Sequence, residues 1–257
     1  PVVQDDEVLF DVRAASVSFM DYLMAAGGYQ LRPPLPYAPG TEAVGIVRAV
    51  GRDVRHFKPG DRIAGSNWHG GLAEQMVAKE WKCALVPDTV EDAPAATVLH
   101  AYLTAYCALI VKARLQPDET ILITGAAGGV GLATIDLARK LDARIIAGIG
   151  SDNKSEIVVR YGAAEVINYR TEKLRDRLRA LTDDQGIDVC LENIGGEFFQ
   201  QVARTMNYGG RLMPIGFASG DIPELPMGLP LVKNYSIIGF VTYNWADRFK
   251  EDSMEAI

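Results

Sequence analysis

The chain has 257 residues, of which 48% are hydrophobic and 23% are charged, a composition typical of a globular protein with one large domain or two ordinary ones. Its net charge of −7 argues against a nucleic-acid partner, because surfaces that bind nucleic acids are basic. The three cysteines are too far apart for a disulfide framework or a zinc finger, which predicts a cytoplasmic environment, and no stretch is long and apolar enough to span a membrane.

The first 88 residues are expected to form a compact, β-rich unit. Short segments of alternating apolar and polar residues are separated by turns that are rich in glycine and proline. The expected elements are a helix over 18–26 and strands over 7–16, 42–50 and 72–77. Gly45, inside the second of these strands, indicates a bulge or a close approach of two backbones.

The pattern changes near residue 91. Apolar residues at helical spacing predict one helix over 91–112, and from residue 120 onward strands alternate with helices. The expected strands are 121–124, 144–149, 165–168, 187–191, 210–216 and 236–241, and the expected helices are 132–141, 153–161, 172–181 and 197–206. This alternation predicts a doubly wound parallel sheet of the α/β class.

Residues 120–131 carry the most specific motif in the chain. A buried strand breaks at Gly125, a glycine-rich turn follows, and an amphipathic helix begins. Such a turn brings the N–H groups and the positive end of a helix close to a pyrophosphate. The run Ala126-x-Gly128-x-x-Gly131 departs from the dinucleotide fingerprint only in its first glycine. We therefore predict a nicotinamide dinucleotide site, and the alternative is a turn with a structural role alone.

The end of the second strand predicts which dinucleotide binds. NAD sites place a carboxylate there for the ribose 2′-hydroxyl, but this strand ends at Gly150-Ser151 without one. Asp152 follows in the loop, and Lys154 lies two residues further on. A hydroxyl and a lysine suit a 2′-phosphate, so Ser151 and Lys154 favour NADPH. The alternative is that Lys154 is an ordinary surface lysine.

Short segments spread over nearly the whole chain carry a family resemblance. They are Val17-Ser-Phe-Met-Asp21, Pro33-Pro-Leu-Pro36, Pro39-Gly-Thr-Glu-Ala-Val-Gly45, Phe57-Lys-Pro-Gly-Asp-Arg62, His69-Gly-Gly-Leu-Ala-Glu74, Thr104-Ala-Tyr106, residues 125–131 and Ile215-Gly-Phe-Ala-Ser-Gly220. Together they resemble the zinc-independent quinone oxidoreductase (NADPH:quinone reductase) group of the medium-chain dehydrogenase/reductase superfamily.

The resemblance implies the domain organisation. A GroES-like β-rich catalytic domain is expected over 1–94 and a Rossmann NADPH-binding domain over 95–245. Residues 246–257 would begin a return to the catalytic domain. By the same comparison, we expect a short N-terminal strand segment and the rest of the C-terminal return to be missing from this sequence.

The chain lacks the residues that hold zinc in related enzymes. Zinc-dependent relatives have a cysteine and a histidine where this chain has Ser18 and Thr41, and their cluster of four cysteines is missing here. His56, His69 and His100 show no ligand-like spacing. We therefore expect no metal site.

The resemblance also implies site residues. Those on the cofactor side are Thr104, Ala127, Gly128, Gly129, Val130, Ser151, Lys154, Tyr169, Asn193, Phe217, Phe240, Val241 and Thr242. Ser18 and Tyr29 match positions on the substrate side. The Tyr29 hydroxyl is able to polarise a carbonyl oxygen as hydride arrives, and the alternative is aromatic packing at the rim of the site.

The chain departs from the group at positions that bear on the substrate. The usual asparagine is Ser18, and in the run that leads to Thr104 a proline is Leu99 and a threonine is Ala101. His100 is new in that run, and it is either a proton donor or a packed helical histidine.

The implied function is an NADPH-dependent reductase of quinones or other α,β-unsaturated carbonyl compounds. The first alternative is an enoyl-thioester (enoyl-CoA) reductase. The second is a non-catalytic, NADPH-binding member of the group that binds RNA or has a structural role. A homodimer is also implied, with apolar strands over 222–232 and 236–241 pairing across a two-fold axis, unless these strands belong to an ordinary core.

Overall fold

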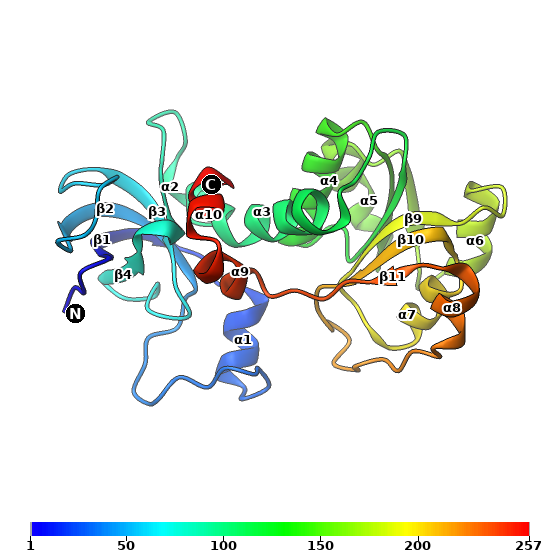
Figure 1. The fold of residues 1–257 in the computed structure, drawn as a ribbon, viewed down its shortest axis with the longest axis horizontal. Helices are drawn as coiled ribbons and strands as arrows, with labels where there is room; N and C mark the ends of the chain where they lie inside the picture. The colour runs from blue at the N-terminus through cyan, green and yellow to red at the C-terminus, as the bar shows by residue number, and fades with distance from the viewer. Residues whose placement is uncertain (1, 257) are drawn as a thin grey trace. The chain divides into compact units, whose positions relative to one another are not determined.

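The computed structural model describes residues 2–256, which fold into two compact units (Figure 1). The first unit comprises the chain up to Leu103 together with the residues from Thr242 onward, and the second comprises Thr104–Val241. The domain limits expected from the sequence, after residues 94 and 245, stay predictions. Among the described residues, no helix has the length and apolar character needed to cross a membrane.

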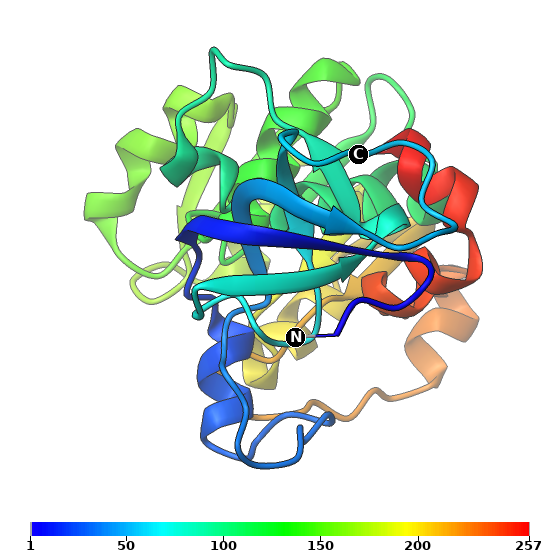
Figure 2. The ribbon, with the colours of Figure 1, turned by 90° about the vertical axis from the view of Figure 1, so that its left-hand side faces the viewer.

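The first unit is built on a five-stranded antiparallel sheet (Figure 2). Its strands lie in the order β4-β1-β2-β3-β5, with bounds β1 Glu7–Ala15, β2 Glu42–Val50, β3 Arg62–Ser66, β4 Gln75–Lys79 and β5 Cys83–Leu85. Phe10, Ile63 and Met76 are fully buried on one face of the sheet. Gly45 lets β1 and β2 approach closely, because a Cβ there would lie 2.1 Å from the carbonyl oxygen of Asp11. The β-rich unit that the sequence predicts is therefore present.

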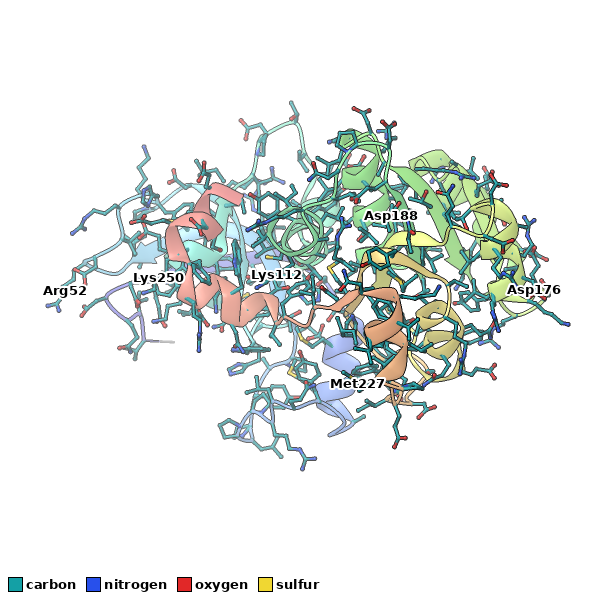
Figure 3. All side chains as sticks on the ribbon, turned by 45° about the vertical axis from the view of Figure 1, so that its right-hand side comes forward. Arg52, Lys112, Asp176, Asp188, Met227 and Lys250 are labelled. Carbon is teal, nitrogen blue, oxygen red and sulfur yellow. The ribbon has the colours of Figure 1, made fainter. Side chains whose placement is uncertain are left out.

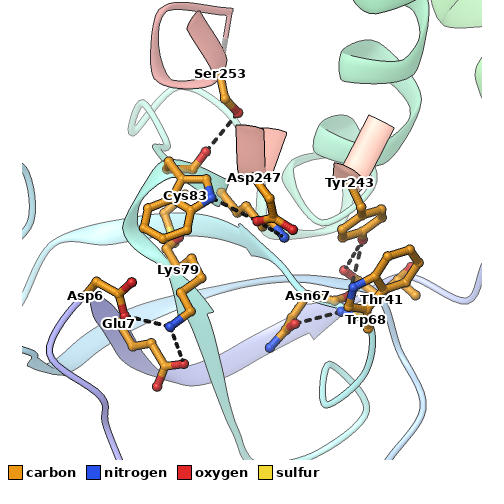
Figure 4. A network of polar contacts seen from close by, with 12 residues as sticks. Asp6, Glu7, Thr41, Asn67, Trp68, Lys79, Cys83, Tyr243, Asp247 and Ser253 are labelled. Carbon is orange, nitrogen blue, oxygen red and sulfur yellow. Dashed lines mark hydrogen bonds and ion pairs between the residues drawn. The ribbon is translucent and has the colours of Figure 1, made fainter. Parts of the chain in front are cut away.

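Helices from both ends of the chain complete this unit. They are α1 Phe19–Ala25, a 3-10 helix Glu80–Lys82, α2 Asp92–Ala95, the start of α3 Val98–Tyr106, α9 Thr242–Arg248 and α10 Lys250–Ala256. Polar contacts hold α9 and α10 against the sheet's connections (Figure 4): the Trp81 Nε1–H donates to Asp247 at 3.1 Å, and the Ser253 hydroxyl donates to the Trp81 carbonyl at 2.9 Å. The last helices of the chain are thus an integral part of the first unit.

The second unit is a parallel six-stranded sheet in the order β11-β10-β9-β6-β7-β8. Its strands are β6 Thr120–Thr124, β7 Arg144–Ile149, β8 Glu165–Asn168, β9 Ile187–Glu192, β10 Met206–Pro214 and β11 Ser236–Ile237. The chain runs from β6 outward to β8 and then crosses to β9 on the other side of β6. The predicted doubly wound parallel sheet is confirmed.

Helices cover both faces of the parallel sheet (Figure 1). One face packs on α4 Gly129–Lys140, α5 Ser155–Tyr161 and a π-helical segment Cys107–Ala113, and the other on α6 Leu174–Leu181 and α7 Gly196–Ala203. Ile121 and Ile123 of β6 contribute to one core and Leu122 to the other. This two-sided burial explains why the strand is a continuous apolar run in the sequence.

Three expected elements differ most from the structure. The single helix expected over 91–112 is divided into α2, α3 and the π-helical segment. The strand expected over 222–232 is wrong: its first part has no regular structure, and Gly228–Lys233 forms helix α8. Proline removes backbone donors from a strand, whereas Pro230 stands in the first turn of α8, where the N–H has no helical partner. The strand expected over 236–241 shortens to β11.

Candidate active site

The turn after β6 offers a helix N-terminus without a side-chain cap. Gly125 turns the chain with φ of +60°, and α4 begins at Gly129 after the exposed Gly128, which has no side chain to cap the helix. Gly131 lies so close to the turn that a Cβ there would be 2.5 Å from the Ala126 carbonyl oxygen. The first N–H groups of α4 are therefore available to an anion, as a pyrophosphate site requires.

The switch point of the parallel sheet, where the chain crosses from one side of β6 to the other, lies beside this turn. β6 has β7 on one side and β9 on the other, and the crevice at the carboxyl ends of such strands is where ligands bind in doubly wound sheets. Asn193, directly after β9, donates its backbone N–H to Thr124 Oγ1 at 2.9 Å and its amide Nδ2 to the Thr124 carbonyl at 2.7 Å. Phe217 follows β10 in the neighbouring loop, where the Ala218 N–H donates to the Asn193 carbonyl. These bonds fix the loop after β9 to the end of β6.

A buried carboxylate anchors the same loop. Glu192 is fully buried and accepts hydrogen bonds from Thr124 Oγ1 at 2.8 Å and from the backbone N–H groups of Ile194 and Gly195, both at 2.9 Å. Burial raises the pKa of Glu192, and the three donors oppose that rise. The sequence interpretation missed this residue, although a carboxylate that ends an apolar strand is a recognisable signal.

The ends of β7 and β8 bring together Ser151, Lys154 and Tyr169. The Tyr169 N–H donates to the Ile149 carbonyl at 3.1 Å, and its ring packs on Phe198 with centroids 4.6 Å apart. A Cβ built at Gly150 would lie 3.1 Å from the Tyr169 hydroxyl, so the phenol reaches the tip of β7. Burial raises the pKa of Tyr169, which therefore stays protonated at neutral pH. Ser151 donates its hydroxyl to Asn153, and Lys154 is exposed in a 3-10 turn.

The remaining candidates on the cofactor side are spread over both units. Ala127, Val130 and Phe240 pack against the same apolar core under α4. Thr104 is buried on α3, whereas Val241 is 47% exposed. Thr242 is the first residue of α9 and belongs to the first unit.

Ser18 forms the N-cap of α1. Its hydroxyl and its backbone N–H both donate to Asp21 Oδ2 at 2.7 Å, and the Asp21 N–H donates to Ser18 Oγ in return. The other oxygen of Asp21 accepts the Gly40 N–H at 2.9 Å. This reciprocal capping stabilises a helix N-terminus and keeps the Ser18 hydroxyl hydrogen-bonded within the protein.

Tyr29 lies in an aromatic cluster of the first unit. Its ring lies 6.5 Å from that of Trp68, and Trp68 stacks on Tyr243 with centroids 4.4 Å apart. The Tyr243 hydroxyl donates to the backbone carbonyls of Thr41 and Asn67, which keeps its ring in place (Figure 4). Tyr29 is only partly buried, and that burial raises its pKa. A protonated phenol beside flat apolar rings suits a planar ligand that carries a carbonyl oxygen.

Glu42 is the second carboxylate that the sequence interpretation missed. It is 4% exposed, accepts the Ser16 hydroxyl at 3.0 Å and accepts the backbone N–H of His100 at 2.9 Å. Since His100 is in the first turn of α3, the Glu42 carboxylate serves as the cap of that helix. Burial raises the pKa of Glu42 to about 7, and burial lowers the pKa of His100, whose ring lies 6.2 Å from that of Tyr243.

Replacement of Glu42 by glutamine should remove part of the pH dependence of stability. The folded protein holds the Glu42 proton up to about pH 7, whereas the unfolded chain releases it near the ordinary value of 4.5. This group therefore lowers the free energy of unfolding as the pH rises between these values, by up to about 3 kcal/mol. Urea unfolding of the wild type and Glu42→Gln at pH 5, 6 and 8 measures the difference. Parallel pH profiles would contradict the prediction.

Two protein-family models match the chain. Residues 4–88 match the alcohol dehydrogenase GroES-like domain, and residues 129–257 match the family described as zinc-binding dehydrogenase. Ser18 stands where zinc-dependent relatives have a cysteine, and its hydroxyl donates to Asp21. Within residues 2–256, no three His, Cys, Asp or Glu side chains are grouped as a metal site requires.

Related proteins and solved structures give the same result. A quinone oxidoreductase-like protein 2 homolog of Nematostella vectensis is 38% identical over 247 residues, which are 96% of this chain and 67% of that protein. The quinone oxidoreductase of Escherichia coli, solved with NADPH, superposes with a TM-score of 0.89 at 28% identity. The superposition covers 100% of this chain and 79% of the Escherichia coli chain. The CurK enoyl reductase superposes equally well, with a TM-score of 0.89 at 26% identity over 99% of this chain and 79% of that chain. The chain therefore belongs to the zinc-independent quinone oxidoreductase group of the medium-chain dehydrogenase/reductase superfamily, a group of oxidoreductases.

Proposed function

We propose that this protein is an NADPH-dependent reductase of quinones and other α,β-unsaturated carbonyl compounds. The observation that carries the proposal is the turn after β6, which presents the uncapped N-terminus of a 12-residue helix at the switch point of the sheet. The names of the related oxidoreductases, and the NADPH in the Escherichia coli structure, support the same cofactor and the same class of acceptor.

The start of α4, Asn193 and Tyr29 have a proposed part in the reaction. When bound, a nicotinamide dinucleotide would supply a hydride to an electron-poor acceptor. The first N–H groups of α4 would hold the pyrophosphate, and Asn193, fixed by its two bonds to Thr124, would hold the nicotinamide end. Tyr29 donates a hydrogen bond to the carbonyl oxygen of the acceptor and thereby stabilises the charge that develops there. The proton that completes the reduction comes from Tyr29 or from water.

The first experiment is a titration of the wild type with NADPH and NADH, followed by nicotinamide fluorescence. The protein is then assayed with a quinone, a simple enone and an enoyl-CoA. Oxidation of NADPH by the quinone or the enone supports the proposal. Binding of NADPH without turnover of any of the three would support instead a non-catalytic member of the group. Failure to bind either nucleotide would overturn the proposal.

An enoyl-thioester reductase is the second candidate. It is favoured by the similarity to the CurK enoyl reductase, which covers nearly the whole chain. The acceptors separate the two candidates, because a thioester reductase would turn over the enoyl-CoA with a much higher kcat/KM than the quinone.

Lys154→Ala should reduce the preference for NADPH. Lys154 is exposed in the loop after β7, where the ribose of a dinucleotide lies in doubly wound folds, and a charge-assisted bond to a 2′-phosphate contributes roughly tenfold in affinity. NADPH affinity should therefore fall by about that factor, while NADH affinity stays the same. The two dissociation constants of the variant measure this directly. An unchanged ratio would mean that Lys154 is an ordinary surface lysine.

We also propose that the protein forms a homodimer through the edge of the parallel sheet at β11. Both residues of β11 are exposed, and the preceding segment exposes Ile222, Met227, Leu231 and Val232, each by at least 70% (Figure 3 labels Met227). An apolar surface beside an open strand edge suits the pairing of two copies. Light scattering measures the mass in solution, and a monomer at micromolar concentration would contradict this proposal.

A further inference from the structure

We infer that Arg170 determines cofactor specificity by binding the 2′-phosphate of NADPH, and that Asn168 is the residue that positions it. This inference rests on the proposed function, because it assumes a dinucleotide at the turn after β6. It concerns the carboxyl ends of β7 and β8, where Gly150, Asp152, Asn168 and Arg170 come together.

The guanidinium of Arg170 lies beside the tip of β7. A Cβ built at Gly150 would be 3.4 Å from Arg170 Nε and 3.1 Å from the Tyr169 hydroxyl. The positive charge of Arg170 also acts on the Tyr169 phenol and opposes the rise of its pKa. Arg170 and Tyr169 therefore flank the glycine after which the ribose would lie, and the planar fork of an arginine suits two phosphate oxygens at once.

The charged side chains around the tip of β7 differ in whether they have an ion-pair partner. The Asp152 carboxylate accepts the Asn168 amide at 2.6 Å, and Glu172 is paired with Arg177 at 2.8 Å and also accepts the Asn168 N–H. In contrast, neither Lys154 nor Arg170 has an ion-pair partner within residues 2–256. Of the two carboxylates only Glu172 is ion-paired in the described part of the chain, so two unpaired cations stand beside one unpaired carboxylate, Asp152, and this local excess of positive charge in a chain with a net charge of −7 favours an anion.

Asn168 connects the parts of this arrangement. Asn168 is 6% exposed, and its bonds to the exposed residues Asp152 and Arg170 are partly buried. Its Nδ2 holds Asp152, and its Oδ1 accepts the backbone N–H of Arg170 at 3.1 Å. One buried amide thus fixes the carboxylate nearest the tip of β7 and the backbone from which the arginine projects. Without it, Asp152 would be free to repel a phosphate and to accept the 2′-hydroxyl of NADH.

The test compares dissociation constants of NADPH, NADH and adenosine 2′,5′-bisphosphate, measured by calorimetry on the full chain. Arg170→Ala should weaken NADPH and the bisphosphate roughly tenfold and leave NADH unchanged. Arg160→Ala is the matched control, because it removes the same charge from an exposed position of α5 and should change none of the three. If Arg170→Ala keeps the wild-type ratio of NADH to NADPH, the inference is overturned while the proposed function stands. If the wild type binds neither dinucleotide, the proposed function itself fails.

The positioning part is tested by a rescue. Asn168→Ala should also narrow the preference for NADPH, and the double variant Asn168→Ala/Asp152→Ala should regain NADPH affinity because the released carboxylate is gone. A loss of affinity that is equal for NADPH and NADH, and that Asp152→Ala does not rescue, would mean that Asn168 only supports the fold. Thermal unfolding of each variant shows whether it is folded at the temperature of the titration.

Discussion

Gly131→Ala should lower the free energy of unfolding by about 3 kcal/mol and weaken dinucleotide binding at least tenfold. A Cβ at this position would lie 2.5 Å from the carbonyl oxygen, 2.7 Å from the carbonyl carbon and 2.7 Å from the Cα of Ala126. All three are backbone atoms, so no side-chain rotation relieves the contact. The start of α4 would have to move away from the end of β6, and with it the N–H groups that we propose for the pyrophosphate.

The expected loss of stability in Gly131→Ala is opposite in sign to the effect of helix propensity alone. Alanine is about 1 kcal/mol more favourable than glycine inside a helix, and Gly131 is the third residue of α4. A loss of stability therefore measures the close approach of the helix to the turn rather than helix propensity. Urea unfolding gives the free energy, and calorimetry with NADPH gives the affinity.

Gly129→Ala is the matched control for this prediction. Two residues earlier, a Cβ meets no heavy atom within 4 Å apart from its chain neighbours and the backbone of its own helix. Its stability should equal or slightly exceed that of the wild type. If Gly131→Ala proves as stable as Gly129→Ala, the close approach of α4 to the turn is not what requires glycine at position 131.

The parallel sheet was predictable because its signal lies in local periodicity. β7 and β8 occupy the residues that the sequence predicted, 144–149 and 165–168, since short β-branched runs between turns and amphipathic helices leave few other arrangements. The rules of parallel connections then leave only a few possible orders of the strands, of which the structure has β11-β10-β9-β6-β7-β8. The class of the second unit and the position of its glycine turn could therefore be predicted from the sequence alone.

The errors have a different physical origin. The expected helix over 91–112 ignored Glu42, which is 58 residues away from His100 in the chain and caps a new helix start there. Likewise, the bonds of Thr124 to Glu192 and Asn193 join residues that are 68 and 69 positions apart. Such contacts depend on tertiary structure, which single-sequence patterns do not contain. Glu42 was missed for this reason, whereas Glu192 had a sequence signal, its place at the end of an apolar strand, that the interpretation did not use.

The second large effect is expected from Glu192→Ala. This variant leaves the buried Thr124 hydroxyl, the buried Gly195 N–H and the partly buried Ile194 N–H without their acceptor. Each unsatisfied buried donor costs about 1–3 kcal/mol, and three donors lose their acceptor. Water that enters the cavity would satisfy some of them and so reduce the total cost, and we therefore expect the free energy of unfolding to fall by about 3 kcal/mol.

The same variant should weaken dinucleotide binding through Asn193. The Thr124 hydroxyl donates to Glu192 and accepts from Asn193, so its orientation depends on the carboxylate. Thr124→Val removes that hydroxyl and leaves the bonds of Glu192 to the loop backbone. If Glu192 acts on Asn193 through Thr124, the losses of NADPH affinity in the two single variants should not add in the double variant. Additive losses would show that the two residues act independently.

The pH dependence of the free energy of unfolding separates the effect of the Glu192 charge from the effect of its side-chain packing. Burial raises the pKa of Glu192 above its ordinary value of 4.5, so the folded protein holds this proton more tightly than the unfolded chain does. The group therefore lowers the free energy of unfolding as the pH rises above 4.5, as Glu42 does. In the Glu42→Gln background, the contribution of Glu192 is the difference between the pH profiles with and without Glu192→Gln, a substitution that keeps one oxygen for the loop. Parallel profiles would show that Glu192 does not hold the proton more tightly in the folded protein.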